Sequence, residues 1–444
     1  MISPLLTPDG RALLESLPPY DNAQIFALSA RLREAGYHPE LIAAALTQSR
    51  LRERARAKFG DFAERMFFTA DGLEQATRLS VAAFHAAGLR AAGAQHIIDF
   101  GCGIGADSLA FAGLGLHVSS IEMDAETAAA ASENLSIFPH AQVIEADGLT
   151  LDLHTLGADA LWLDPARRTT DAGGSPGTIP PNHAEGTSQS AHHSGSEHRS
   201  SSAPRSSSGR ILHPELWTPP LSHALDLAHQ FPCAGIKVAP GIDYQHLPSD
   251  TRVEWVSVNG SLVEAIIWCG TAATIPGRCA LIIDKDEQAY RLSTLHGDPA
   301  TPPDHVAPRE LARYIYEPDP AVIRAGGIRT LCRDFQLAPV ASAIAYLTGD
   351  QPLSSPFFRG FEVIDVLPVD VARLRKRLQS EDVGRVEIKK RGIDLDPEVL
   401  RKKLRLRAKG TQEMTLIISP TISGQRRAIL ARRLPTSCTD LGTL

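Results

Sequence analysis

The chain has 444 residues, of which 43% are hydrophobic and 22% charged, and its formal net charge at pH 7 is −6. This length is enough for two to four domains, each with a buried core. No apolar run approaches the roughly 18 residues that span a bilayer, and the start of the chain lacks the basic and apolar regions of a signal peptide. These features exclude a membrane-spanning segment and predict a soluble, cytoplasmic protein.

The cysteines and histidines give no sign of a metal site. The six cysteines are scattered without a C-x-x-C pair, and several of the 16 histidines fall in a polar, low-complexity tract. Neither pattern has the spacing of zinc ligands or of a disulfide framework. We therefore expect reduced cysteines and no bound metal.

The first 92 residues are expected to form a helical leader. Apolar residues recur with helical spacing over 22–35, 39–59 and 72–87, and glycines such as Gly36 and Gly60 separate these segments.

The pattern changes at 93–275, where short apolar runs alternate with helix-like stretches. Strands are predicted at 96–100, 117–122, 141–145, 158–163, 235–238 and 262–269. This alternation predicts an α/β domain built on a parallel sheet. Residues 171–209 interrupt it, and because they are rich in Gly, Ser, Pro and His we expect a disordered surface insertion there.

The C-terminal part divides into two regions. Residues 276–355 are expected to be a mixed connecting region, whereas 356–434 show a β-α-β-α-β-β order typical of a compact α+β module. Residues 358–433 contain 19 Lys and Arg against 10 Asp and Glu, which leaves a net −15 for the rest of the chain. A basic module on an acidic body favours an anionic partner, with nucleic acid the first choice, although a solvated charged helix face is the alternative.

A glycine-rich turn follows the first predicted strand of the α/β domain. Asp99 ends the strand, Gly101, Gly103 and Gly105 follow, and a helix then begins. Such a turn presents backbone N–H groups to a bound cofactor. The spacing is G-x-G-x-G, and at this point both NAD and S-adenosylmethionine (SAM) fit.

Acidic residues at the strand ends favour SAM over NAD. Asp99 can meet the ammonium of an amino-acid moiety, whereas it would repel a pyrophosphate. Glu122, Asp147 and Asp164 end the next three predicted strands, and ligands bind beyond the carboxyl ends of such strands. Asp147 and Asp164 could each also cap a helix, and Asp124 is expected to be a structural N-cap.

The order of these motifs resembles the class I SAM-dependent methyltransferases. The stretch Asp164-Pro-Ala-Arg-Arg168 resembles the bacterial members that carry a C-terminal THUMP-like domain, and so do three further stretches, which begin at Gly72, Lys237 and Val383. The resemblance covers nearly the whole chain apart from 171–209. It implies a Rossmann-like methyltransferase sheet with an N-terminal helical region and a C-terminal α+β THUMP-like domain.

The resemblance also implies roles for individual residues. The glycine loop with Asp99 would hold the methionine part of SAM, Glu122 the ribose hydroxyls and Asp147 the adenine amino group. Thr69 and Gln75 would close over the cofactor, although an ordinary N-cap and an exposed helix surface explain them equally well.

The methyl acceptor would lie at Asp164. In related amino-methyltransferases the motif is D/N-P-P-Y/F/W, in which a side-chain oxygen and a backbone carbonyl bind the amine and the aromatic ring stacks on the base. Here Asp164 and Pro165 match, whereas Ala166 and Arg167 depart from the pattern. The guanidinium of Arg167 could stack on a base or bind phosphate instead.

The leading hypothesis is a SAM-dependent methyltransferase of RNA, with the basic module as its docking domain. Six cations there are expected to contact phosphates without reading bases: Lys389, Lys390, Arg391, Arg401, Lys402 and Lys403. The alternatives are a methyltransferase of a protein or small molecule, and a non-catalytic RNA-binding protein with a vestigial SAM fold.

Overall fold

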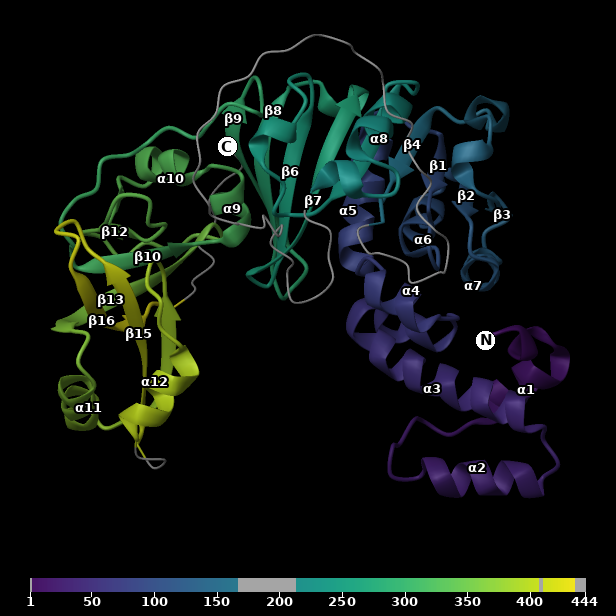
Figure 1. Cartoon of the computed structure of the whole chain (residues 1–444), viewed down its shortest axis with the longest axis horizontal. Coiled ribbons are helices and arrows are strands. Elements are labelled where there is room, and N and C mark those ends of the chain that lie inside the picture. Colours follow the sequence, from purple (N-terminus) through teal and green to yellow (C-terminus); the bar gives the residue numbers. More distant parts are fainter. Residues whose placement is uncertain (1, 167–212, 407–409, 436–444) are drawn as a thin grey trace, which may run out of the picture.

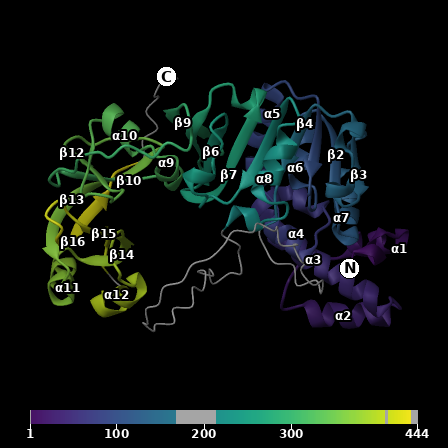
Figure 2. The ribbon, with the colours of Figure 1, turned by 45° about the horizontal axis from the view of Figure 1, so that its top comes forward.

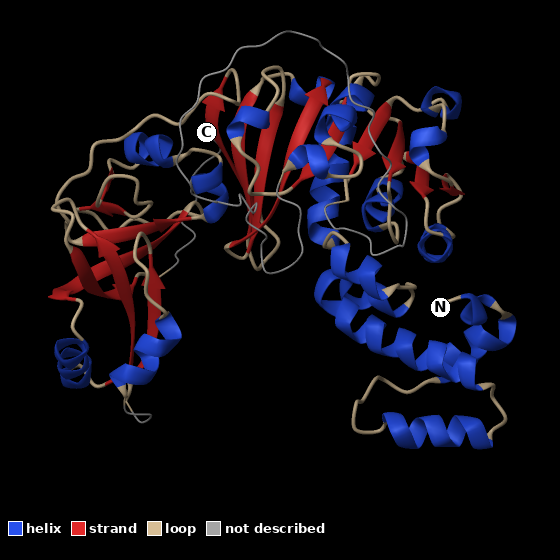
Figure 3. Ribbon diagram, in the orientation of Figure 1, coloured by secondary structure: helices blue, strands red, loops and turns tan. Residues whose placement is uncertain are grey.

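The structure is a computed structural model that describes residues 2–166, 213–406 and 410–435. Two β-sheets follow a helical leader along the chain (Figures 1 and 3). The insertion expected at 171–209 and the expected site residue Arg167 lie outside the described residues.

The leader packs against the start of the first sheet's domain. Phe59 and Phe68 share a buried core with Ile104, which lies inside the glycine loop, and with Leu135 further along the chain. Pro39 begins the longest helix and Gly60, at a φ of 56°, follows its end. The helices are α1 (Pro8–Ser16), α2 (Ile25–Glu34), α3 (Pro39–Phe59), α4 (Ala70–Gln75) and α5 (Leu79–Ala91), with short 3-10 turns at Ser3–Leu6 and Gly60–Glu64.

The single helix predicted over 72–87 is wrong, because the chain breaks between α4 and α5. Ala76 and Arg78 have extended backbone, with ψ angles of 135° and 140°. Thr77, between them, is buried and its hydroxyl donates to Asp107 and accepts from Lys237. Tertiary hydrogen bonds to a buried hydroxyl therefore override the local helical pattern.

The first sheet contains nine of the described strands: β1 (His96–Phe100), β2 (His117–Glu122), β3 (Ala141–Glu145), β4 (Ala160–Leu163), β5 (Cys233–Val238), β6 (Arg252–Val258), β7 (Ser261–Gly270), β8 (Gly277–Ile283) and β9 (Ala289–His296). Their order is β3-β2-β1-β4-β5-β7-β6-β8-β9. Strands β1 to β5 run parallel, β7 is antiparallel to β5 and β6, β8 is parallel to β6, and β9 is antiparallel to β8.

The strand order reverses between β1 and β4. The chain builds outward from β1 through β2 to β3, and then returns to place β4 and β5 on the other side of β1. Helices α6 (Ala106–Gly113), α7 (Ala125–Leu135) and α8 (Leu221–Ala228) occur among these strands. In open α/β sheets, such a reversal leaves a ligand-binding crevice beyond the carboxyl ends of the strands.

The second sheet contains seven of the described strands: β10 (Tyr314–Pro318), β11 (Ala338–Pro339), β12 (Leu347–Gly349), β13 (Phe358–Pro368), β14 (Val383–Lys390), β15 (Gln412–Pro420) and β16 (Arg426–Arg433). Their order is β11-β12-β10-β13-β16-β15-β14. Helices α9 (Pro320–Arg324) and α10 (Ile328–Asp334) follow β10, and α11 (Val371–Ser380) and α12 (Pro397–Leu404) lie within the C-terminal module. The β-α-β-α-β-β order predicted for that module is confirmed.

The sheets divide the chain differently from the boundaries expected at 275 and 355. Strands β8 and β9 belong to the first sheet, whereas β10, β11 and β12 belong to the second. The expected connecting region at 276–355 is thus shared between both sheets. Strands β6, β9, β10, β11 and β12 were not among the predicted elements.

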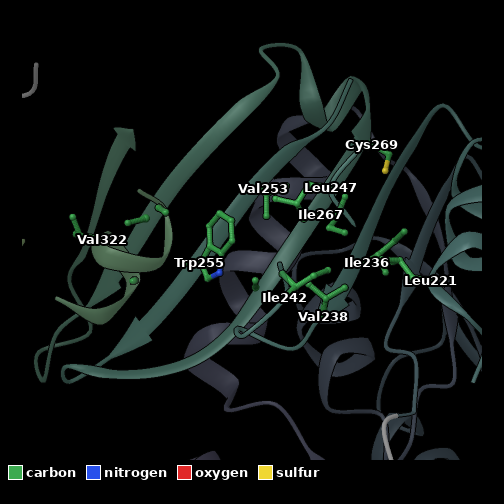
Figure 4. Close-up of a cluster of buried hydrophobic side chains, with 14 of the residues drawn as sticks. Leu221, Ile236, Val238, Ile242, Leu247, Val253, Trp255, Ile267, Cys269 and Val322 are labelled. Carbon is green, nitrogen blue, oxygen red and sulfur yellow. The ribbon is translucent and has the colours of Figure 1, made fainter. Parts of the chain in front are cut away.

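One buried core runs from the first sheet into the second. It includes Ile236 and Trp255 on the first sheet, Val322 on α9, and Tyr316 and Phe358 on the second sheet. Figure 4 shows Val322 on a helix beside the sheet that carries Trp255. Because this core is continuous, the two sheets are packed together rather than joined only by a linker.

The leader and the C-terminal module project from the same side of the first sheet (Figures 1 and 2). On the leader side, a Cβ on Gly72 would approach Ile104, within the glycine loop, to 2.5 Å. On the other side, Arg359 donates to the carbonyl oxygen of Asn259 at 3.3 Å, in the turn after β6. Since β6 is parallel to β5, both flanking parts contact the edge formed by the carboxyl ends of the parallel strands.

Candidate active site

The glycine loop turns sharply between β1 and α6. Gly101, Gly103 and Gly105 have φ angles of 74°, 57° and 81°, which residues other than glycine rarely adopt. A Cβ on Gly101 or Gly103 would meet nothing within 4 Å, so the loop borders open space. The residues present therefore fit a cofactor that approaches the backbone closely.

Asp99 lies beneath this loop and is almost inaccessible. Its side chain accepts a hydrogen bond from the Ser108 hydroxyl. Burial, together with the nearby charges of Asp107 and Asp164, raises the pKa of Asp99 to about 8, against the opposing effects of Ser108 and Lys237. A cationic group bound beside Asp99 would stabilise its ionised form.

The other predicted cofactor carboxylates are held by backbone groups. One Glu122 oxygen accepts from the N–H of Gly103 at 3.0 Å, and the other accepts from the N–H of Asp124 at 2.9 Å. Asp147 is exposed and accepts from the N–H of Leu149 at 3.0 Å, as the N-cap of a short 3-10 turn. The helix-capping role predicted for Asp124 is confirmed, since it caps α7.

Thr69 and Gln75 lie at the two ends of α4. Thr69 is its N-cap and accepts from the N–H of Gly72 at 3.0 Å, while Gln75 is exposed at the last position. Lys58 donates to three carbonyl oxygens at the end of the helix, at 2.7 to 2.8 Å. These bonds anchor α4 to α3 near the glycine loop.

Asp164 follows β4, beside the end of β5. Lys237, the fifth residue of β5, is buried and donates to both Asp164 and Thr77. Although burial alone would lower the pKa of Lys237, the charges of Asp164, Asp107 and Glu264 raise it above its usual value. Lys237 is therefore a buried cation fixed against a carboxylate that is partly open to solvent.

His85, Asp107 and Glu264 form further buried charged contacts behind Lys237. The His85 ring has Asp107 at 2.7 Å from Nδ1 and Glu264 at hydrogen-bond distance from Nε2, and it stacks on Trp162 at 4.4 Å. Burial opposes the charged imidazolium, but Glu264 and Asp107 raise the pKa of His85 to about 9. Burial also opposes ionisation of Asp107, yet His85 and Lys237 lower its pKa.

The structure brings together the carboxylates at the reversal of the sheet. Asp99 is the penultimate residue of β1, Asp164 directly follows the neighbouring β4, and Glu122 ends β2 on the other side of β1. Pro165 is buried directly after Asp164, and Ala166 pairs with Thr218 through two backbone hydrogen bonds.

Sequence reasoning did not assign roles to the ion group behind this edge, which comprises Thr77, His85, Asp107, Lys237 and Glu264. A lysine inside the apolar run of β5 was a usable signal, because an isolated charge in a buried strand requires a partner. His85 and Glu264 come from elements 179 residues apart, so only the fold reveals their contact.

Within the part of the chain that the structure describes, no cluster of His, Cys, Asp or Glu has the arrangement of a metal site. The described helices include none that is long and apolar enough to cross a membrane.

The predicted basic residues of the C-terminal module differ in their surroundings. Lys389 lies 2.8 Å from Glu317 and 3.1 Å from Glu387, and its side chain is 14% exposed. Arg391 is 3.9 Å from Glu317 and its guanidinium carbon lies 5.2 Å from the centre of the Tyr346 ring. These two cations therefore join β14 to β10 within the protein.

The remaining four predicted cations are exposed, namely Lys390, Arg401, Lys402 and Lys403. Arg401 and Lys402 border an open cavity of about 850 Å³, which we call the basic cavity. Its other cationic lining residues are Arg385, Arg405, Arg432 and Arg433, and its acidic ones are Glu387 and Glu413.

An open sheet with a glycine loop and acidic strand ends at its order reversal defines a Rossmann-like enzyme that binds a nucleotide-type cofactor. The chain is 31% identical over 392 residues to an uncharacterized S-adenosylmethionine-dependent methyltransferase of Mycobacterium tuberculosis, found in strains CDC 1551 / Oshkosh and ATCC 25618 / H37Rv. The alignment covers 86% of this chain and 93% of the relative. The chain therefore belongs to the SAM-dependent methyltransferases, its cofactor is SAM, and the non-catalytic alternative is set aside.

Other comparisons agree on the architecture. A THUMP domain-like family model matches residues 358–433, and a domain of unknown function (DUF8688) matches residues 1–55. A crystal structure of a "putative methyltransferase" from Porphyromonas gingivalis W83 superposes with a TM-score of 0.66 at 19% identity, over 94% of this chain and 100% of that one. The expected methyltransferase fold with a THUMP-like C-terminal domain is confirmed.

Proposed function

We propose that this methyltransferase transfers the methyl group of SAM to an amino group or ring nitrogen of an RNA base. The basic cavity carries the proposal, because it gathers six cations on the module that contacts the cofactor edge of the first sheet. Such a cluster suits the phosphates of a nucleic acid.

The residues that would hold SAM lie around the glycine loop. Asp99 would face the ammonium group, and the loop at Gly101, Gly103 and Gly105 would follow the methionine part. Glu122 would accept from the ribose hydroxyls, although its oxygens already accept from two backbone N–H groups. Asp147 would meet the adenine amino group, and Thr69 and Gln75 would border the cofactor from α4.

When bound, SAM supplies an electrophilic methyl group on a sulfonium sulfur. An acceptor nitrogen would have to lie in line with the carbon–sulfur bond that breaks as the new nitrogen–carbon bond forms, so alignment of the acceptor by the protein would contribute most of the rate. Asp164 would accept a hydrogen bond from the acceptor N–H and orient its lone pair, while the proton leaves to Asp164 or solvent. Lys237 binds Oδ2 of Asp164 and leaves Oδ1 for this contact.

Pro165 and Arg167 complete the proposed acceptor site. The buried Pro165 fixes the chain direction directly after Asp164, and its carbonyl would bind the amine as in the resembling enzymes. Arg167 would replace the stacking aromatic residue.

The basic cavity refines which cations would dock the RNA. Arg401 and Lys402 border it, and Lys390 and Lys403 are exposed elsewhere on the same module. Lys389 and Arg391 form ion pairs with Glu317 within the chain, so their contribution to phosphate binding should be smaller.

The experiment is incubation with methyl-labelled SAM and, separately, total RNA and total protein from cells that lack this gene. Label should enter RNA and appear in a methylated nucleoside after nuclease digestion. The Asp164→Asn variant is the control for incorporation that does not depend on the enzyme. Label that enters only the protein or small-molecule fraction would show that the acceptor is not RNA.

A further inference from the structure

A second cavity lies on the opposite edge of the first sheet from the proposed cofactor site. It has a volume of about 350 Å³ and is bordered by β8, the end of β9, the following loop and α10. Arg278 is the second residue of β8, which runs parallel to β5 through β6. The cavity therefore lies at the amino ends of the parallel strands, whereas Asp164 and Lys237 lie at their carboxyl ends.

Arg278 in this cavity is a buried cation whose Nε and Nη1 atoms receive no hydrogen-bonding partner from the described residues. It is only 3% exposed, and its Nε and Nη1 atoms are enclosed with no hydrogen bond. The described chain also gives it no ion pair, and the main contact of its guanidinium is the face of Tyr244, 4.1 Å from the ring centre. Burial lowers the pKa of Arg278, although Tyr244 and Asp298 oppose that shift.

An unpaired guanidinium at such a position is costly, because a buried charge normally has a counter-ion. Nη2 lies against Gly326, which also borders the cavity: a Cβ on Gly326 would approach it to 3.2 Å. An anion in the cavity would supply the missing counter-charge from this side.

Two further guanidinium groups stand at the rim of the cavity. Arg329 pairs with Asp304 and Arg333 with the adjacent Asp334, and these arginine side chains are 65% and 73% exposed. Exposed pairs of this kind contribute little stability, so both arginines can turn to a stronger acceptor. Leu295, Pro302 and Pro303 provide an apolar wall.

We propose that this cavity binds the phosphate group of a small phosphorylated organic molecule. Three guanidinium groups match the several oxygens of a phosphate dianion better than the two of a carboxylate. The apolar wall accommodates the organic part, and the volume suits a small molecule. The site is separate from the basic cavity and does not depend on the identity of the methyl acceptor.

The test measures binding to the full-length protein by isothermal titration calorimetry, with inorganic phosphate and ribose 5-phosphate as probes and ribose as the phosphate-free control. We expect both phosphates to bind and ribose to give no heat. The Arg278→Met variant should weaken binding of both phosphates at least tenfold, since it removes a charged hydrogen-bond donor.

Two more variants keep the test decisive. Arg329→Gln/Arg333→Gln changes only exposed rim residues and should weaken binding about tenfold even if the Arg278→Met variant folds poorly. Arg373→Gln/Lys376→Gln, at two exposed positions of α11, is the matched control for the loss of two charges and should bind as the wild type does.

Three results would overturn the proposal. They are the absence of binding at millimolar phosphate, unchanged affinity in the rim variant, and loss of phosphate binding only in Arg405→Gln/Arg432→Gln, which would place the anion in the basic cavity. SAM affinity should stay unchanged in the rim variant, so a failure here says nothing against the methyltransferase site.

Discussion

Lys237 donates a hydrogen bond to Asp164 from the neighbouring strand, and the two side chains differ in exposure. The Lys237 side chain is 6% exposed and that of Asp164 28% exposed. The cation is thus held from inside the protein, while the carboxylate reaches the edge at which the glycine loop opens. This arrangement fixes the direction of the Asp164 carboxylate before any acceptor binds, as alignment of an acceptor requires.

Replacing Asp164 should separate methyl transfer from cofactor binding. We expect Asp164→Ala to abolish detectable transfer and Asp164→Asn to reduce it on the order of 10²-fold or more, because the acceptor N–H loses a charged partner. SAM affinity, measured by calorimetry, should change little in either variant. Near-normal turnover by Asp164→Ala would remove Asp164 from the proposed mechanism.

Lys237→Met should destabilise the fold as well as slow the reaction. It leaves Asp164 without its neighbouring cation and Asp107 with only His85, and the loss of one partner from a buried ion group costs about 3–5 kcal/mol of unfolding free energy. Denaturant unfolding measures this loss. The double variant Lys237→Met/Asp164→Asn should recover part of the stability, because it also removes one uncompensated charge.

The candidate site shows which residues can be predicted from the sequence and which require the structure. Local signals predicted the carboxylates Asp99, Glu122 and Asp164 and the three glycines. The signal was a predicted strand that runs into a turn and has a carboxylate at its end. Their shared location follows from one rule for parallel sheets. The break at Thr77 could not be predicted in this way, because its cause is a pair of hydrogen bonds to residues 30 and 160 positions away.

In the basic module, the sequence likewise did not show which cations are paired within the protein. A run of cations predicted phosphate contacts at Lys389 and Arg391, yet both form ion pairs with Glu317 on β10. A sequence records the number of charges, but the pairing of strands decides which of them face solvent. The basic cavity combines Arg385 of β14 with Arg432 of β16, and this combination arises only from the strand order.

Stability should decrease as pH rises from 6.5 to 9. The pKa of His85 increases from 6.5 to about 9 on folding, so its contribution is complete below pH 6.5 and is lost as pH passes 9. Ionisation of Asp99 also lowers the stability as pH rises from about 4 to 8, because its folded pKa is raised to about 8. Measuring the unfolding free energy of the wild type and of Asp99→Asn across this range separates the contribution of His85 from that of Asp99. A decline that disappears completely in Asp99→Asn would contradict the His85 assignment.

SAM binding at pH 7 should release a proton from Asp99. The carboxyl is mainly protonated at pH 7 when its pKa is about 8, and a bound ammonium group would lower that pKa. The calorimetric enthalpy of SAM binding should therefore depend on the ionisation enthalpy of the buffer. In Asp99→Asn this dependence should vanish and affinity should fall. Equal enthalpies in two buffers for the wild type would show that Asp99 does not meet the ammonium.

RNA affinity should fall steeply with salt, and the basic cavity should account for part of the slope. Arg405 and Arg432 border the cavity and form no ion pair within the described chain, so each is available to a phosphate. For single-stranded RNA, Arg405→Gln/Arg432→Gln should reduce the slope of log affinity against log salt by about 1.4, because each phosphate that is no longer neutralised lowers it by about 0.7. The matched control, Arg373→Gln/Lys376→Gln, removes two exposed charges from the same module outside the cavity and should keep the wild-type slope. Filter binding at several salt concentrations measures the slope for the wild type and both variants.

An equal change of slope in both variants would mean that general charge, rather than the cavity, binds the RNA. A slope near zero in the wild type would argue for an acceptor other than RNA.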